Sequence, residues 1–145
     1  MRFNVNEIPP EGLDLSEEAD LAKWDIETSQ IKFKGPLSLT AHIDRQKDDI
    51  FASVHARGTT VRGCSRCLAD FPMPLRLDKI FLYSARGRRV VNMDSDIREE
   101  IMLDYPIQSL CKPTCEGLCP VCGKNLNEGV CNCKSHLENW NKKIK

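Results

Sequence analysis

The chain has 145 residues, of which 41% are hydrophobic and 6% aromatic, and its formal net charge is +0. This length allows one domain, or one domain with a small metal-stapled appendage. The balanced charge argues weakly against a general nucleic-acid binder, and no apolar run is long enough to cross a membrane or to resemble a secretory signal. We therefore expect a cytoplasmic protein with no membrane partner.

The N-terminal residues predict short elements. Residues 2–5 suit an edge strand, which Pro9-Pro10 would end. Ser16 stands before an acidic stretch and is a favourable N-cap residue, so a short helix is expected over 16–22.

The middle of the chain reads as antiparallel sheet. Apolar and polar residues alternate over 37–44 and again over 50–57, with a polar turn between them. This period of two is the signature of half-buried strands, and the two runs predict a hairpin. Residues 58–63 can extend the second strand, and residues 71–84 predict a further strand.

A helix is expected over 96–104, capped by Asp94 or Ser95 and stopped by Pro106. A frayed helix is expected over 135–145. The fold class is therefore mainly β with short helices (α+β). We expect an antiparallel sheet or partial barrel over residues 1–108 and a zinc-stapled tail over residues 109–145.

Eight cysteines in a chain without a secretory signal are more typical of metal binding than of disulfides. The sharpest motif is Cys119-Pro120-Val121-Cys122-Gly123, in which two thiolates can turn onto one ion and the glycine permits the tight backbone that follows. A closed site needs four ligands. The prediction is a structural zinc held by Cys119, Cys122, Cys131 and Cys133, with Cys111 and Cys115 as alternates.

The remaining pair, Cys64 and Cys67, allows several interpretations. It can form a second four-thiolate site with Cys111 and Cys115, a structural turn between strands, or a reactive dithiol beside arginines. The same ligands could also hold an iron–sulfur cluster, although the knuckle spacing favours zinc. A thiol- or metal-dependent enzyme using Cys64 and Cys67 is therefore the alternative function, and zinc storage is a third.

The sequence shows no other catalytic signature, such as a P-loop or a nucleophile elbow. Three histidines, none in a metalloprotease pattern, make a hydrolytic zinc site improbable. We therefore expect no catalytic residues and no small-molecule substrate.

Three segments carry a family resemblance: Gly63-Cys64-Ser65-Arg66-Cys67-Leu68, then Leu103-Asp104-Tyr105-Pro106, then the tail from Cys111 to Asn127 with Cys131-Asn132-Cys133. Together, from about Gly35 onward, they resemble the YceD family, the large ribosomal RNA subunit accumulation proteins. The resemblance implies a non-enzymatic role in making or maintaining large-subunit ribosomal RNA. Since family members differ in whether they keep the tail cysteines, it also implies that zinc supports structure.

The basic character of the middle of the chain fits that process in part. The net charge is −6 over residues 1–30, +7 over 31–91, −4 over 92–104 and +3 over 105–145. The acidic and basic parts either pair within the fold or leave a surface that faces phosphate. Candidate RNA or partner contacts are Arg57, Arg62, Arg66, Arg86, Arg88 and Arg89. The expected partner is ribosomal RNA, a large-subunit ribosomal protein or an assembly factor.

Overall fold

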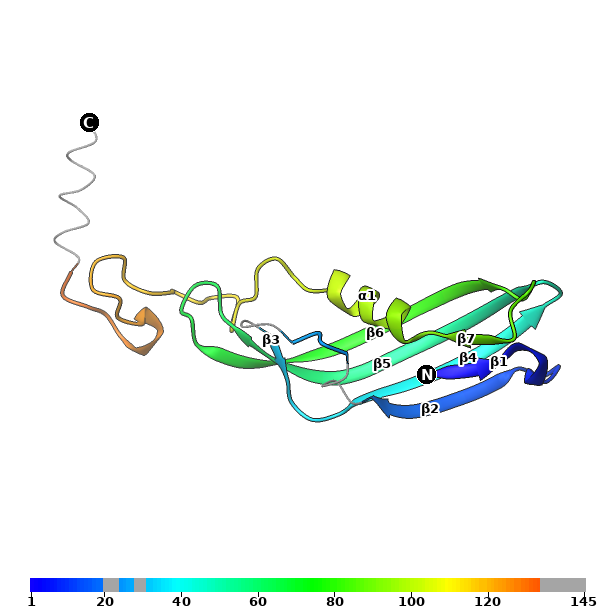
Figure 1. Ribbon diagram of the computed structural model, residues 1–145. Helices are drawn as coiled ribbons and strands as arrows, with labels where there is room; N and C mark the ends of the chain where they lie inside the picture. Colours follow the sequence, from blue (N-terminus) through cyan, green and yellow to red (C-terminus); the bar gives the residue numbers. More distant parts are fainter. Residues whose placement is uncertain (20–23, 28–30, 134–145) are drawn as a thin grey trace, which may run out of the picture. The chain divides into compact units, whose positions relative to one another are not determined.

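The computed structural model describes residues 1–19, 24–27 and 31–133. The chain forms two compact units (Figure 1). The first unit contains Met1–Val61 and Pro72–Pro106, and the second contains Arg62–Phe71 and Ile107–Lys145. The second unit thus combines the tip of a long hairpin with the tail. The division of the sequence into folding units 1–108 and 109–145 stays a prediction.

A five-stranded sheet forms the first unit and confirms the mainly β fold class. Its strands are β2 (Leu13–Ala19), β3 (Ile31–Phe33), β4 (Leu37–Gln46), β5 (Asp49–Gly63) and β6 (Asp70–Ser84). Strand β5 pairs with β3, β4 and β6, and β2 adds to the far side of β4. The sheet stays open and does not close into a barrel.

The predicted hairpin is present as β4 and β5, which pair antiparallel from Ser38↔Arg57 to Gln46↔Asp49. Alternate residues of both strands are buried, so that Ala41 and Val54 lie opposite each other on the core face. Strand β5 keeps this alternation to its end, where Thr60 and Arg62 take the buried positions. The bend-prone region with Pro72 and Pro74 is accommodated within β6.

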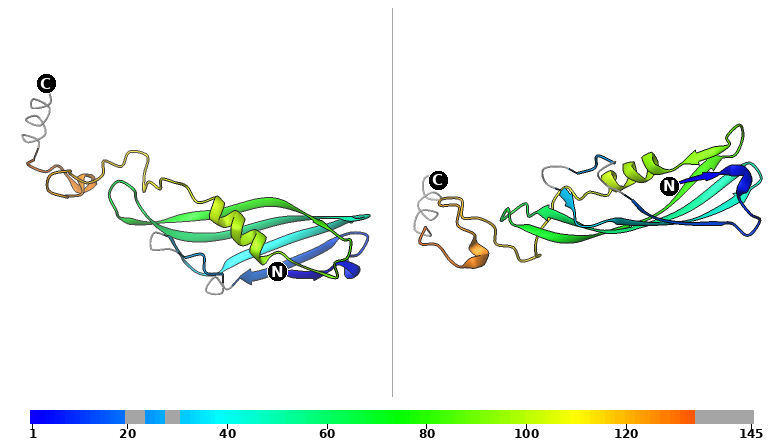
Figure 2. Two further views of the ribbon diagram at one scale, coloured as in Figure 1. Left: turned by 45° about the horizontal axis from the view of Figure 1, so that its top comes forward. Right: turned by 60° about the horizontal axis from the view of Figure 1, so that its bottom comes forward.

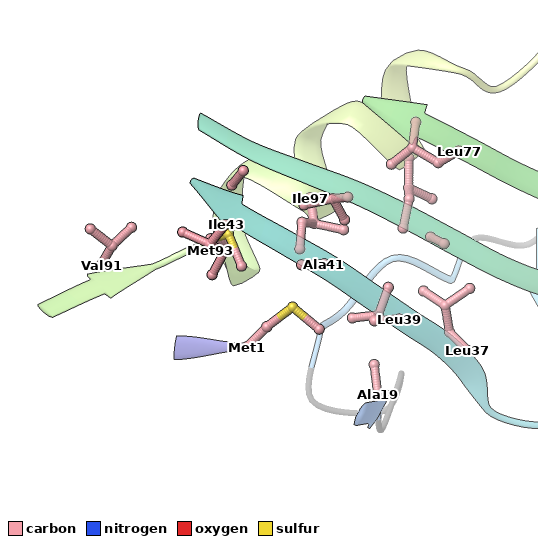
Figure 3. Packing of buried hydrophobic residues seen from close by; sticks show 14 of the residues in the cluster. Met1, Ala19, Leu37, Leu39, Ala41, Ile43, Leu77, Val91, Met93 and Ile97 are labelled. Carbon is pink, nitrogen blue, oxygen red and sulfur yellow. The ribbon is translucent and has the colours of Figure 1, made fainter. Parts of the chain in front are cut away.

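A helix and a small ribbon cover the core face (Figure 2). The ribbon pairs β1 (Arg2–Asn4) antiparallel with β7 (Val90–Asn92), and a 3-10 turn, η1 (Val5–Glu7), follows β1. Helix α1 (Asp94–Leu103) buries Ile97 and Ile101 completely. Figure 3 shows Ile97 among core residues of the sheet such as Ala41 and Leu77.

The helix predicted from Ser16 is wrong. The helix expected from Ser16 is strand β2, where Ser16 pairs with Thr40; residues 20–22 of that prediction lie outside the described part. Tertiary pairing with β4 overrides the local capping signal because Leu13 and Leu15 can then pack against the core. The helix predicted over 96–104 is confirmed as α1, which begins two residues earlier than expected.

The cap of α1 also differs from the prediction. Met93 is the N-cap residue and makes no side-chain capping bond, so neither Asp94 nor Ser95 serves this role. The Asn92 side chain instead accepts a hydrogen bond from the Asp94 amide at 3.1 Å. The helix expected over 135–145 lies outside the described residues. No helix among the described residues has the length and apolar character needed to cross a membrane.

Candidate metal centres

The second unit contains two groups of four cysteines, and all eight are free thiols. The first group, here called the hairpin site, consists of Cys64, Cys67, Cys111 and Cys115. The second group, here called the tail site, consists of Cys119, Cys122, Cys131 and Cys133. Within each group the four sulfur atoms lie within 4.8 Å of one another.

The sulfur spacing of the hairpin site fits a tetrahedral metal. Sγ of Cys64 lies 3.7 Å from Sγ of Cys115, and Sγ of Cys67 lies 3.7 Å from Sγ of Cys111. Four sulfurs placed about 2.3 Å from a zinc ion at tetrahedral corners are about 3.8 Å apart, whereas a disulfide brings two sulfurs to about 2.0 Å. The four thiols are therefore spaced so that they could bind one ion, and they do not form two disulfides.

Each site begins with a knuckle of the same backbone design. In the hairpin site, the Leu68 amide donates to the Cys64 carbonyl at 2.9 Å, and the Cys64 amide donates to the Ala69 carbonyl at 2.9 Å. In the tail site, the amide of Gly123 donates to the carbonyl of Cys119 at 2.9 Å, and that of Cys119 to the carbonyl of Lys124 at 2.8 Å. The Cys64–Cys67 turn is therefore a second metal knuckle in backbone form, although its sequence lacks the proline and glycine of the first.

Backbone amides make one thiol of each knuckle easy to ionise. The Cys111 amide, 3.4 Å from the Cys64 sulfur, is the main cause of a Cys64 pKa lowered to about 6. The amides of Cys122 and Val121 lower the pKa of Cys119 to about 6 in the same way. Burial instead raises the pKa of Cys111 to about 12. A metal binds thiolates. Each site therefore contains one thiol that ionises easily and others that would lose their proton only when the metal binds.

The tail approaches the hairpin tip very closely at Gly117. This residue is buried and has a φ of +77°, and a Cβ atom built there would lie 3.1 Å from the carbonyl oxygen of Arg66. Arg66 also donates from Nη1 to the carbonyl of Cys115 at 2.9 Å, and its own carbonyl accepts from the Leu118 amide. The Ser65 amide binds the Ser109 carbonyl at 2.8 Å. These bonds explain how a segment without a large apolar core holds Cys111 and Cys115 beside the knuckle.

An asparagine links the two sites. Asn127 lies in the turn η3 (Leu126–Glu128) of the tail-site loop, and its Nδ2 is 3.3 Å from the sulfur of Cys115. Sequence reasoning did not single out this residue or Gly117. The only signal available was the Asn125-x-Asn127 turn pattern, which predicts a capped turn but says nothing of a sulfur acceptor.

The structure places the six candidate arginines in different surroundings. Arg57 donates to Asp78 at 2.5 Å and to the Leu77 carbonyl at 2.9 Å, and Arg62 is only 4% exposed. Arg66 is used in the second unit, as described above. The remaining three, Arg86, Arg88 and Arg89, are all exposed and follow strand β6.

A basic end of the first unit forms where this loop meets the β4–β5 turn. The amide of Ala85 donates to the Asp48 carbonyl at 2.7 Å, and Arg86 binds the Asp48 carboxylate through Nε and Nη2 at 2.9 and 2.6 Å. Arg45, near the end of strand β4, donates from Nε to the Lys47 carbonyl at 3.1 Å. The basic end is defined here as Arg45 and Lys47 near the β4–β5 turn together with the exposed Arg86, Arg88 and Arg89, of which Arg86 binds Asp48.

Three aromatic residues that could stack on the bases of single-stranded RNA, Phe71, Phe81 and Tyr83, pack within the fold. Phe81 and Tyr83 are partly buried against the core and stack on each other with ring centroids 6.4 Å apart. The Tyr83 hydroxyl donates to Asp96 at 2.6 Å. Phe71 packs against the hairpin site. A stacking platform for single-stranded RNA is therefore not formed by these three rings.

Residues 78–142 match the family model described as Large ribosomal RNA subunit accumulation protein YceD. The chain is 40% identical over 69 residues to a maize (Zea mays) protein named Large ribosomal RNA subunit accumulation protein YCED homolog 1, chloroplastic. That match covers 47% of this chain and 23% of the maize protein.

Two mycobacterial proteins of uncharacterized function are also similar. The protein from Mycobacterium leprae is 22% identical over 122 residues, covering 73% of this chain and 56% of that protein. The protein from Mycobacterium tuberculosis is 28% identical over 106 residues, covering 62% and 51%. The chain thus spans about half the length, or less, of these curated relatives. No solved structure matches. Over residues 78–142 the chain is therefore similar to the YceD family, whose name states a role in the accumulation of large-subunit ribosomal RNA.

Proposed function

We propose that this protein is a non-enzymatic factor that supports the synthesis, processing or stability of large-subunit ribosomal RNA in the cytoplasm. The family match over residues 78–142 carries the proposal. The partner would be ribosomal RNA itself, a large-subunit ribosomal protein or an assembly factor. The exposed basic end supports a phosphate-bearing partner, since arginine binds phosphate oxygens through its planar fork.

The proposal includes one structural zinc ion in each cysteine site. The tail-site ligands are Cys119, Cys122, Cys131 and Cys133; the other four cysteines serve the hairpin site. Sulfur distances of 3.7 Å and the shared knuckle backbone support zinc in a closed site, with no position left for a substrate. When bound, the ion would hold the second unit folded. Purified protein is then expected to carry about two zinc ions per chain, without the visible colour of an iron–sulfur cluster.

A thiol enzyme using Cys64 and Cys67 is the competing function, favoured by the lowered pKa of Cys64. Two matched double variants separate these ideas. If the four hairpin-site cysteines serve one metal, Cys64→Ser with Cys67→Ser and Cys111→Ser with Cys115→Ser will impair function equally, because each removes half of the same ligand set. A thiol enzyme would lose activity in the first variant and keep most of it in the second.

The direct test is the ratio of large- to small-subunit ribosomal RNA in the source cells with and without the protein. We expect the ratio to fall on deletion and to recover when the protein is restored. A protein with Arg86, Arg88 and Arg89 all changed to Ala should restore it poorly. The matched control changes the exposed Lys32, Lys34 and Arg76 to Ala, which removes the same charge elsewhere. An unchanged ratio on deletion would refute the proposed function.

A further inference from the structure

We infer that the two metal sites bind their ions as a coupled pair, with Asn127 as the positioning residue that joins them. This inference rests on the proposed binding of metal at both sites. Asn127 lies within the tail-site loop, between the ligands Cys122 and Cys131, yet its side chain contacts the sulfur of Cys115, a ligand of the hairpin site.

The orientation of the Asn127 amide follows from its hydrogen bonds. Its Oδ1 accepts from the Glu116 amide at 3.1 Å, so its Nδ2 is the atom that faces Cys115 at 3.3 Å. The same Nδ2 lies 2.9 Å from Oδ1 of Asn125, an acceptor. Turning the amide over would place donor against donor at Glu116, so the network fixes an N–H group on the sulfur.

A donor at this sulfur favours metal binding. Four thiolates around a divalent cation leave a net charge of −2, and an N–H group directed at one sulfur stabilises that excess charge. Groups that hydrogen-bond to ligands in this way commonly change metal affinity by about 10-fold to 100-fold. The hairpin site therefore gains affinity when Asn127 is held in place.

The tail-site loop holds Asn127 in place. Its backbone is tied to the segment between the sites, because Leu126 donates to the Gly117 carbonyl at 2.9 Å and Leu118 forms a bridge with Asn125. The loop is short of apolar contacts, and Cys122 and Gly123 are exposed. A metal at the tail site, which ties together both ends of the loop, is thus the element that orders Asn127. By linkage, each metal then raises the affinity of the other by the same factor.

The test is a titration of the full metal-free chain with Co²⁺ against a competing chelator. The amide signals of Leu68 and Gly123, followed by NMR, report the hairpin and tail sites separately. We expect Asn127→Ala to lower the hairpin-site affinity about 10-fold. Cys119→Ser with Cys122→Ser, which disables the tail site, should lower it by a similar factor. Combining both changes should add little more, because both remove one interaction.

Two further variants separate a donor on sulfur from a merely structural turn. Asn127→Asp keeps the acceptor for Glu116 but replaces the donor with a negative oxygen, so it should weaken the hairpin site more than Asn127→Ala does. If the residue only shapes the turn, Asn127→Asp will weaken the hairpin site no more than Asn127→Ala does, because both variants lose the hydrogen bond to Asn125. Asn132→Ala, which removes an exposed amide between Cys131 and Cys133, is the control that should leave the hairpin-site affinity unchanged.

The possible failures are distinguishable. If two ions bind and Asn127→Ala leaves the hairpin-site affinity unaltered, or if its effect adds fully to that of the disabled tail site, the coupling is refuted while metal binding stands. If the cysteines bind no metal, both the coupling and the proposed structural metal are refuted.

Discussion

Leu68 and Gly123 occupy the same position in the two knuckles, directly after the second cysteine, and both have a left-handed backbone. Their φ angles are +59° and +72°. Glycine adopts this conformation without strain, whereas another L-residue is destabilised there by about 1–2 kcal/mol. Packing of the Leu68 side chain offsets little of this backbone strain, because the side chain is 71% exposed. The hairpin knuckle is thus the more strained of the two.

A reciprocal pair of substitutions should reveal this strain. Leu68→Gly removes it but adds about 0.5–1 kcal/mol of chain entropy to the unfolded state, leaving a net gain of about 0.5–1 kcal/mol. Because the knuckle folds around its ion, the hairpin site should bind zinc about twofold to fivefold more tightly in a chelator competition. Gly123→Leu should weaken the tail site by a similar factor, since no atom lies within 4 Å of its built Cβ and only backbone strain changes. Equal affinities in both variants and the wild type would contradict this account.

His42, on the outer face of the sheet, should titrate at a raised pKa. Its Nδ1 lies 2.6 Å from Asp14, and this hydrogen bond is the main reason that its pKa exceeds the ordinary value of 6.5, with Asp44 adding a smaller contribution. A raised folded-state pKa means that the protonated ring stabilises the fold fully below pH 6.5. This contribution is lost as the pH rises through the folded-state pKa.

An NMR titration of the His42 ring checks this prediction. We expect Asp14→Ala to bring the pKa of His42 back toward 6.5. Asp44→Ala, which removes a carboxylate 3.5 Å from Nε2, is the matched variant and should have the smaller effect. A larger effect of Asp44→Ala would show that the hydrogen bond from Asp14 is not the dominant cause.

At the scale of elements, the sequence was most informative where period-2 alternation was long. The runs over 37–44 and 50–57 predicted β4 and the first part of β5, because one face of each strand is buried continuously. The same reasoning failed for β2. Its exposed Glu17 and Glu18 weaken the alternation, and only pairing with β4 decides its conformation.

Polar residues in buried strand positions were equally hard to predict. Arg62 occupies the core-facing alternation of β5 that begins at Ile50, so its burial follows from register. A reading by residue type instead assigns an arginine to the surface. The cysteine sites were also predictable only in part. Spacing along the chain indicated the knuckles. The contact of Asn127 with Cys115 depends on a tertiary approach at Gly117 that no local pattern encodes.

At the scale of the whole molecule, the uneven charge along the sequence is partly neutralised within the first unit. Lys79 pairs with Glu100 at 2.9 Å, and Arg57 pairs with Asp78 at 2.5 Å. These pairs are exposed to solvent, so each contributes little to stability. They nevertheless pair two basic side chains of the sheet, Arg57 and Lys79, with carboxylates of the same unit. The basic end, which combines Arg45, Lys47, Arg86, Arg88 and Arg89 and in which Arg86 binds Asp48, is where the proposed partner is expected to bind.

The two units should differ in their dependence on metal. The first unit has an extensive apolar core with residues such as Leu39, Ile43 and Ile97 fully buried, whereas the second has a small cluster made largely of cysteines. Removing metal with a chelator should therefore unfold the second unit and leave the first folded, since metal-binding energy supplies the folding energy of such small modules.

Hydrogen exchange followed by mass spectrometry is the measurement. After chelation, amides of β4 and of β5 up to Val61 should stay protected, while those of Leu68, Leu118 and Leu126 should exchange freely. Restoring zinc should restore protection at these three, and Mg²⁺ at the same concentration, which prefers oxygen ligands, is the control that should not. Loss of protection throughout β4 would mean that the fold of the first unit also depends on the metal sites, and protection retained at Leu118 and Leu126 would mean that the second unit folds without metal.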